Sequence, residues 1–274
     1  MKSLNEFNNY FILFLKYARV IIKSQFQYKL NAFLLSFAVF FRELGGIIII
    51  YFTLTKFDNL GGWNLNELMF LFSFLFISYS ILIVFFTGFR DFHELVRMGT
   101  FDRYLLRPVG IFFQIISSKA DYFAAVGHGT LGILLFVFTA NSVGITWSVS
   151  KVLYCILAII SGVLIQASIF IMFSCASFWT VKTTNLMDFI FYNTRKVAGY
   201  PISIFPGFIQ KILIYVVPFA FVNYFPAQYF LNKADMGLFP HIYMYLAPII
   251  AVILLIISSF IWRVSLKNYS STGS

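Results

Sequence analysis

The chain has 274 residues, of which 60% are hydrophobic and 11% are charged, and its formal net charge is +10. A soluble fold of this size needs more polar surface than this composition supplies, so soluble enzymes and soluble binding domains are excluded. In lipid, only helices and closed barrels satisfy their own backbone hydrogen bonds, and a helix needs about 20 apolar residues to cross. The long apolar runs therefore predict an all-α integral membrane protein.

Residues 1–29 precede the first apolar run and show a helical spacing of apolar side chains. Phe11, Leu15, Ala18 and Ile22 share one face, whereas the basic residues fall on another. This pattern predicts an amphipathic elbow helix that lies in the cytoplasmic interface of the membrane. The alternative is a plain basic flank to the first span.

Six apolar intervals predict six transmembrane helices within a single domain, residues 1–274. The predicted spans are residues 30–55, 68–89, 111–140, 152–181, 207–222 and 242–262. The fifth lies in a region that prolines interrupt, and proline breaks helices. The segment 224–238 after it is interpreted either as a short re-entrant or interfacial piece, or as part of a simple kinked span.

An even number of spans places both termini on one side of the membrane, and the basic residues indicate which side. With the N-terminus inside, only Lys56, Lys151 and Lys233 lie in the outer loops, and the other loop cations lie inside. Lysine and arginine near span ends are retained in the cytoplasm, so the topology is predicted as N-in and C-in. The positive charge is thereby explained by topology and by contact with anionic lipid, and it does not indicate nucleic-acid binding.

Arg42, Glu43 and His128 fall inside predicted spans, where ionisable groups are costly and mark either a path or a buried pair. Arg42 and Glu43 are adjacent, so their side chains point about 100° apart on a helix and each is expected to find a partner on another span. They form either an interhelical ion pair or a contact with substrate. His128 lies between Gly127 and Gly129, which favours close packing of spans first and a ligand site second.

The densest run of charge lies between the second and third spans, in residues 89–110. A short helix is predicted from Gly88 to Met98, because a glycine follows it. Phe89, Phe92 and Val96 form its apolar face, and the charged face opposite is suited to a soluble partner. The candidate residues for this contact are Arg90, Asp91, Glu94, Arg97, Gly99, Asp102, Arg103 and Arg107.

Sequence motifs for catalysis are missing. The chain has no Gly-Lys-Ser or Gly-Lys-Thr, so it lacks the loop that cradles nucleotide phosphates, and any ATP must be hydrolysed by another subunit. It also has no His-Glu-x-x-His and no Cys-x-x-Cys, and its three histidines are far apart. We therefore predict a non-catalytic chain that binds no metal or cofactor of its own.

Several motifs, taken in order, resemble the ABC-2 type permeases, specifically the six-span bacterial group that works with a second permease and a separate ATPase. They are Gly61-Gly62-Trp63, the segment 98–109 with its Leu-Leu-Arg-Pro, Gly199-Tyr200-Pro201, the segments 217–219 and 224–227, and the tail 262–270. The segment 98–109 is the most specific of these.

The resemblance implies the transmembrane half of an ATP-driven exporter of the type V kind, located in the bacterial cytoplasmic membrane. Residues 89–110 would then be a coupling segment that seats in a groove of an ABC ATPase dimer, and that partner would hold ATP and Mg²⁺. A second permease chain would complete the path, and the family pattern favours a sister permease over a second copy of this chain.

Two other functions remain open at this point. An ion-coupled secondary transporter usually carries several intramembrane carboxylates and inverted repeats, whereas only Glu43 lies clearly at depth here. A membrane scaffold or immunity partner would use the charged loop to bind a protein without transport. For a transporter, an aromatic and apolar interior suits an amphipathic or hydrophobic cargo such as a peptide antibiotic, a drug or a lipid.

Overall fold

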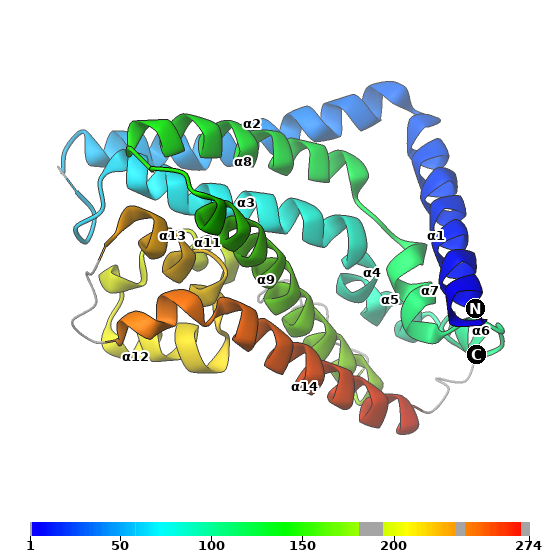
Figure 1. Ribbon diagram of the computed structural model, residues 1–274. Coiled ribbons are helices and arrows are strands. Elements are labelled where there is room, and N and C mark those ends of the chain that lie inside the picture. The colour runs from blue at the N-terminus through cyan, green and yellow to red at the C-terminus, as the bar shows by residue number, and fades with distance from the viewer. Residues whose placement is uncertain (1, 58, 181–193, 234–238, 270–274) are drawn as a thin grey trace.

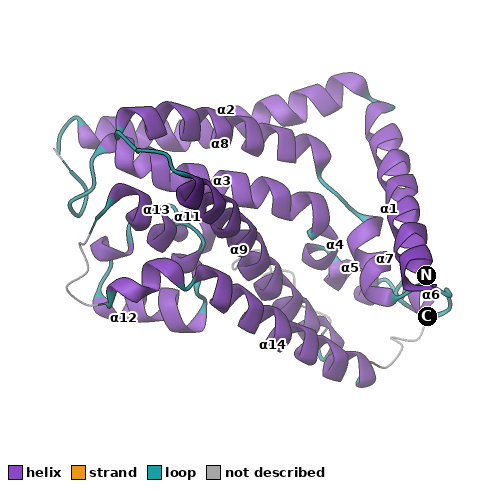
Figure 2. Ribbon diagram, viewed as in Figure 1, coloured by secondary structure: helices purple, strands orange, loops and turns teal. Residues whose placement is uncertain are grey.

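The structure is a computed structural model that describes residues 2–57, 59–180, 194–233 and 239–269. The helices in these ranges are joined by turns and loops, and the described residues contain no β-strand (Figure 2). Some positions of the sequence predictions lie outside the described residues. They are residue 181 of the fourth predicted span, the inner-loop cation Lys182, and residue 270, the last of the tail motif.

Six helices are 21 residues or longer. They are α1 (Lys2–Phe26), α2 (Lys29–Leu54), α3 (Leu65–Phe85), α8 (Tyr122–Ser142), α9 (Val149–Ser174) and α14 (Ala247–Lys267). Of these, α2, α3, α8, α9 and α14 are long and apolar enough to cross a membrane. The protein is thus an all-α, multi-pass membrane protein.

Short helices fill the connections between the long ones. They are α4 (Thr87–Arg90), α5 (Phe92–Arg97), α6 (Asp102–Leu105), α7 (Ile111–Ser118), α11 (Thr194–Ala198), α12 (Gly207–Lys211) and α13 (Tyr224–Leu231). Turns of 3₁₀ helix cover Cys175–Phe178, Ile202–Ile204, Phe219–Phe221 and His241–Tyr245, and a π-helical turn covers Ile212–Val216.

Helices α2, α3 and α8 lie side by side, and α9 packs along α14 across them (Figure 1). Glycines in α8 allow α2 and α3 to pack closely against it. A Cβ atom on Gly127 would lie 2.5 Å from the Ser36 carbonyl oxygen of α2, and one on Gly129 would lie 2.8 Å from Ser80 Oγ of α3. Helix α3 is central, because most of its side chains are buried by these neighbours.

Helix α1 runs steeply across the direction of the long helices, at one end of the bundle (Figure 1). Its Phe14 stacks on Phe85 at the end of α3, and Gln25 Nε2 donates to the Ala120 carbonyl oxygen at 3.2 Å. We call this end, where α4 to α7 also lie, the α1 end. The other end carries the loop 60–67 and is called the opposite end.

The third predicted span, 111–140, contains two helices. Helix α7 ends at Ser118, and Lys119 has extended backbone angles (φ −139°, ψ 135°) before α8 begins at Tyr122. Helix α7 packs against α4 at the α1 end, where a Cβ atom on Gly88 would collide with the Ile115 carbonyl oxygen. The membrane-crossing helix is therefore α8 alone.

The fifth predicted span, 207–222, is not a continuous helix. The segments Gly207–Val216 and Phe219–Leu231 meet at an angle of 74°. Pro218 lies at the bend and lacks the amide hydrogen that would continue the helical hydrogen bonds. We refer to this broken pair, residues 207–231, as the hairpin.

Both ends of the hairpin lie at the opposite end of the bundle. Just before it, Ser203 Oγ donates to the Gly61 carbonyl oxygen at 3.4 Å. In its second leg Tyr224 packs on Trp63, and just after it Lys233 Nζ donates to the Gly62 carbonyl oxygen and to Glu67.

The hairpin therefore enters and leaves at the same end, whereas Phe178 lies at the α1 end in contact with Phe92. The contacts of residues 207–231 therefore fit a re-entrant piece, which was predicted from the sequence at residues 224–238, better than a simple kinked span.

Candidate functional site

The segment 89–110, called the coupling segment, is built from α4, α5 and α6 at the α1 end (Figure 1). Its phenylalanine side chains, Phe89, Phe92 and Phe101, are buried inside this chain. Phe92 packs on Phe101, Phe178 and Trp262 with ring centroids 5.1, 5.3 and 5.2 Å apart, and Phe89 contacts Trp262 at 5.3 Å. This aromatic cluster fixes the coupling segment to the ends of α9 and α14.

A network of charges fixes the same segment to the connection between α7 and α8. Arg90 Nε lies 2.7 Å from Asp91 Oδ1, and Arg90 Nη1 lies 2.7 Å from Asp121 Oδ2. Lys119 Nζ lies 3.2 Å from Asp91 Oδ2 and 3.3 Å from Glu94 Oε2. The predicted helix from Gly88 to Met98 is interrupted at Asp91, between α4 and α5.

The central pair of this network is held in its charged form. Burial lowers the pKa of Arg90, but the hydrogen bond to Asp91 and the charge of Asp121 outweigh it, so the pKa is raised overall. Burial raises the pKa of Asp91, but its hydrogen bond and attraction to Arg90, with Lys119, outweigh it, so the pKa is lowered overall. Both groups stay ionised at neutral pH and serve as a structural clamp.

The turn that carries the Leu-Leu-Arg-Pro motif is held by a residue that sequence reasoning missed. Gln114 of α7 is buried, and its Nε2 donates to the carbonyl oxygens of Tyr104, at 3.0 Å, and Val109, at 2.7 Å. One side chain thus joins both sides of the turn. The only sequence signal is a lone glutamine inside the apolar run 111–116.

Gly99 and Asp102 shape the other half of the segment. Gly99 has a φ of +65°, which side chains with a Cβ atom rarely adopt, and it reverses the chain after α5. Asp102 Oδ1 accepts a hydrogen bond of 2.8 Å from the hydroxyl of Tyr269, whose ring packs edge-on against Phe101. Asp102 therefore anchors the segment to the residues that follow α14.

The seven charged candidate residues therefore divide into two groups. Arg90, Asp91, Glu94 and Asp102 contact their own chain. Arg97, Arg103 and Arg107 are exposed, and none of the three forms an ion pair within the described part of the chain.

Large apolar side chains are exposed beside these arginines, and Leu106 has 85% of its surface accessible. We call this surface the basic tip; it consists of Arg97, Met98, Arg103, Leu105, Leu106 and Arg107.

The intramembrane charges pair differently from expectation. Arg42 Nε and Nη2 donate to Oε1 of the adjacent Glu43 at 3.1 and 2.7 Å, so the expectation that Arg42 pairs with another span is wrong, whereas Glu43 does face a residue of another span, His128. The long guanidinium arm spans the angle between the two positions. His128 of α8 is buried with its Nδ1 3.9 Å from Glu43 Oε1, and its ring contacts Tyr79 edge-on at 4.8 Å.

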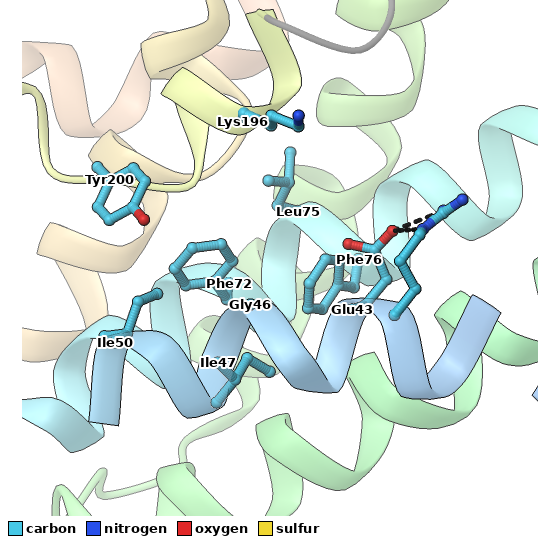
Figure 3. A pocket seen from close by; sticks show the side chains of 10 residues that line it. Glu43, Gly46, Ile47, Ile50, Phe72, Leu75, Phe76, Lys196 and Tyr200 are labelled. Carbon is cyan, nitrogen blue, oxygen red and sulfur yellow. Dashed lines mark hydrogen bonds and ion pairs between the residues drawn. The ribbon is translucent and has the colours of Figure 1, made fainter. Parts of the chain in front are cut away.

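A cavity of about 600 Å³ lies beside this pair, between α2, α3 and the segment that contains α11 (Figure 3). Its wall is mostly apolar and aromatic. Its polar lining comes from Arg42 and Glu43 of α2 and from Lys196 and Tyr200 of the segment that contains α11. Figure 3 shows Glu43, Lys196 and Tyr200 around the cavity. We call it the α2 cavity.

The protein is thus a multi-pass helical bundle with a charged segment docked at one end and a mostly apolar cavity beside α2, an architecture that suits the transmembrane component of a transporter. The family model described as ABC-2 family transporter protein matches residues 37–273, and the chain belongs to this family. No curated protein and no solved structure matches the chain.

Proposed function

We propose that this permease is the transmembrane subunit of an ATP-driven exporter and that the basic tip contacts a separate ABC ATPase dimer. The family supports a transport role, and the single observation that carries the coupling role is the basic tip itself. Three exposed arginines beside exposed leucines suit a groove that is acidic at its rim and apolar at its base.

The contacts behind the basic tip support its role in coupling. The aromatic cluster ties the coupling segment to α9 and α14, and the charge network ties it to the start of α8. A displacement of the tip is therefore carried to three membrane helices through packed rings and ion pairs. Nucleotide-driven closure of the ATPase dimer would in this way bias the arrangement of the spans.

The exposed surface of α2 supports a second permease chain. The side chain of Arg42 is 57% accessible although it lies near the middle of α2, and an arginine in contact with hydrocarbon is costly. A second permease chain would cover this face of α2, and the two chains together would enclose a path. We favour a sister permease over a second copy of this chain. ATP and Mg²⁺ would be bound by the ATPase.

The charge distribution supports the orientation. The α1 end carries the coupling segment and the amphipathic α1, so in the proposed arrangement it faces the cytoplasm, with N-in and C-in topology in the bacterial cytoplasmic membrane. The basic face of α1 would contact anionic lipid. The cargo would be an amphipathic or hydrophobic compound, such as a peptide antibiotic, a drug or a lipid, that enters from the membrane or the cytoplasm.

The test is charge reversal at the basic tip. The double variant Arg103→Glu, Arg107→Glu is expected to insert and fold normally, because both residues are exposed, but to stimulate the ATPase at least tenfold less, since like charges would face each other. Arg263→Glu, an exposed arginine near the end of α14, is the matched control. Full stimulation by the folded double variant would remove the basic tip from the contact.

A further inference from the structure

We propose that the α2 cavity binds an anionic amphiphile, with its acidic headgroup between Arg42 and Lys196 and its apolar body against the aromatic wall. This inference rests on the proposed function, because it names the chemical class that the permease would take from the membrane.

The charge of the cavity is positive. Arg42 and Lys196 contribute two cations and Glu43 one anion, so one positive charge is left over. Glu43 accepts two hydrogen bonds from Arg42 at a single oxygen. A guanidinium has five N–H donors, so three donors of Arg42 remain for an anion. Lys196, on α11, is exposed across the cavity from α2 (Figure 3).

The shape of the cavity suits an elongated apolar molecule. Apart from the polar groups, the wall is formed by side chains that offer carbon surface, namely Ile47, Ile50, Phe72, Leu75 and Phe76. A volume of about 600 Å³ falls within the range of roughly 300–1,000 Å³ that small-molecule sites occupy. The polar groups are few and lie on two sides, as in sites that fix the orientation of one end of a ligand.

The depth of the cavity favours an anionic headgroup over a cationic or neutral one. Arg42 is near the middle of α2, where an excess positive charge is costly and a bound anion offsets that cost. A cationic amphiphile would add to the excess, and a neutral one would leave it unchanged. Carboxylate and phosphate groups both match the geometry of a guanidinium and an ammonium.

The experiment uses the purified permease, with whatever subunits accompany it, in nanodiscs of zwitterionic phosphatidylcholine. Two photoreactive probes of equal length are compared: palmitate with a diazirine in its chain, and the matching long-chain amine. Labelled residues are mapped by mass spectrometry of peptides. We expect palmitate to label α2, α3 and the segment 196–200, and the amine to label them at background level.

Lys196→Gln tests the headgroup contact, because Lys196 is exposed and its replacement leaves the Arg42–Glu43 pair intact. Loss of one charge-assisted contact predicts about tenfold less palmitate labelling of the α2 cavity. Lys211→Gln, an exposed lysine on α12 outside the cavity, is the matched control and should label as wild type. Equal labelling by both probes, or unchanged labelling in Lys196→Gln, would overturn the proposal.

Repeating the palmitate experiment in discs that contain phosphatidylglycerol distinguishes the two sources of an anionic amphiphile. Suppressed labelling would identify the bound species as a membrane lipid, and retained labelling would identify it as a free amphiphile. Both results support the anionic class. Labelling requires no ATPase, so a failure here is separable from a failure of the proposed coupling.

Discussion

The buried glutamine behind the Leu-Leu-Arg-Pro turn provides a sharp test of how the basic tip is held. Gln114→Met keeps the length and approximate volume of the side chain and removes the amide that donates to Tyr104 and Val109. Two buried hydrogen bonds at about 1 kcal/mol each predict a loss of about 2 kcal/mol in the local stability of the turn. This corresponds to roughly thirtyfold more frequent opening of the turn.

Hydrogen exchange followed by mass spectrometry measures this opening directly. The amides of Tyr104 and Val109 are hydrogen-bonded within the turn, to the carbonyl oxygens of Phe101 and Arg107, so a peptide covering residues 101–110 reports on it. In Gln114→Met this peptide is expected to exchange roughly thirtyfold faster, while the long helices keep their wild-type rates. Stimulation of the ATPase should fall in parallel, because a loose tip transmits less displacement.

The chain supplies its own matched control. Gln210 in the hairpin is also buried and also donates to a carbonyl oxygen five residues earlier, that of Phe205, at 2.7 Å. Gln210→Met should accelerate exchange only around residues 205–210 at the opposite end. Equal exchange of residues 101–110 in wild type and Gln114→Met would refute the assignment of Gln114 as the positioning residue of the turn.

Three further predictions concern the contacts around the basic tip. Gly88→Ala should lower the unfolding temperature and weaken ATPase stimulation, because the added methyl collides with α7. Tyr269→Phe keeps its ring but loses a hydrogen bond to a carboxylate, worth about 1.5–3 kcal/mol, and should speed exchange of residues 99–105. The pKa of Asp91 is lowered in the folded protein. The stabilisation from its ion pairs is therefore complete above the ordinary pKa of 3.8, and it is lost as the pH falls through the lowered pKa. The unfolding temperature of Asp91→Asn should therefore decline less than that of wild type on acidification towards about pH 3.

Each of these predictions has its own check. Gly110→Ala is the control for Gly88→Ala, because no atom lies within 4 Å of the position of the added Cβ, and an equal effect of both would argue against the helix contact. Unchanged exchange in Tyr269→Phe would mean that the hydroxyl does not hold the segment. If wild type and Asp91→Asn lose stability in parallel on acidification, the charge network does not depend on Asp91.

The long helices were predictable because their signal is local. An uncharged run of about 20 residues has one stable form in lipid, and the bounds of α3, for example, depend on little else. The amphipathic α1 was visible for the same reason. The third and fifth predicted spans differ from the observed helices, because apolar composition alone does not reveal a break. The helix is interrupted at Lys119 in the third span and at Pro218 in the fifth.

The candidate site was predictable in location but only partly in its details. Charge density pointed to residues 89–110, yet it could not show that Arg90 and Asp91 would be bound by Lys119 and Asp121, which come from the next helix connection. Which charges remain exposed depends on that tertiary contact. The pairing of Arg42 with its neighbour was not predictable from the directions of the two side chains on the helix, because it depends on the reach of the guanidinium.

The central claim is that this permease acts with a separate ATPase, and the most direct test is to identify its companions. The chain would be tagged, purified from its native membrane in mild detergent, and its stoichiometric partners quantified by mass spectrometry. The account predicts a soluble P-loop ATPase together with a second six-span permease. A folded preparation that contains no ATPase would contradict it.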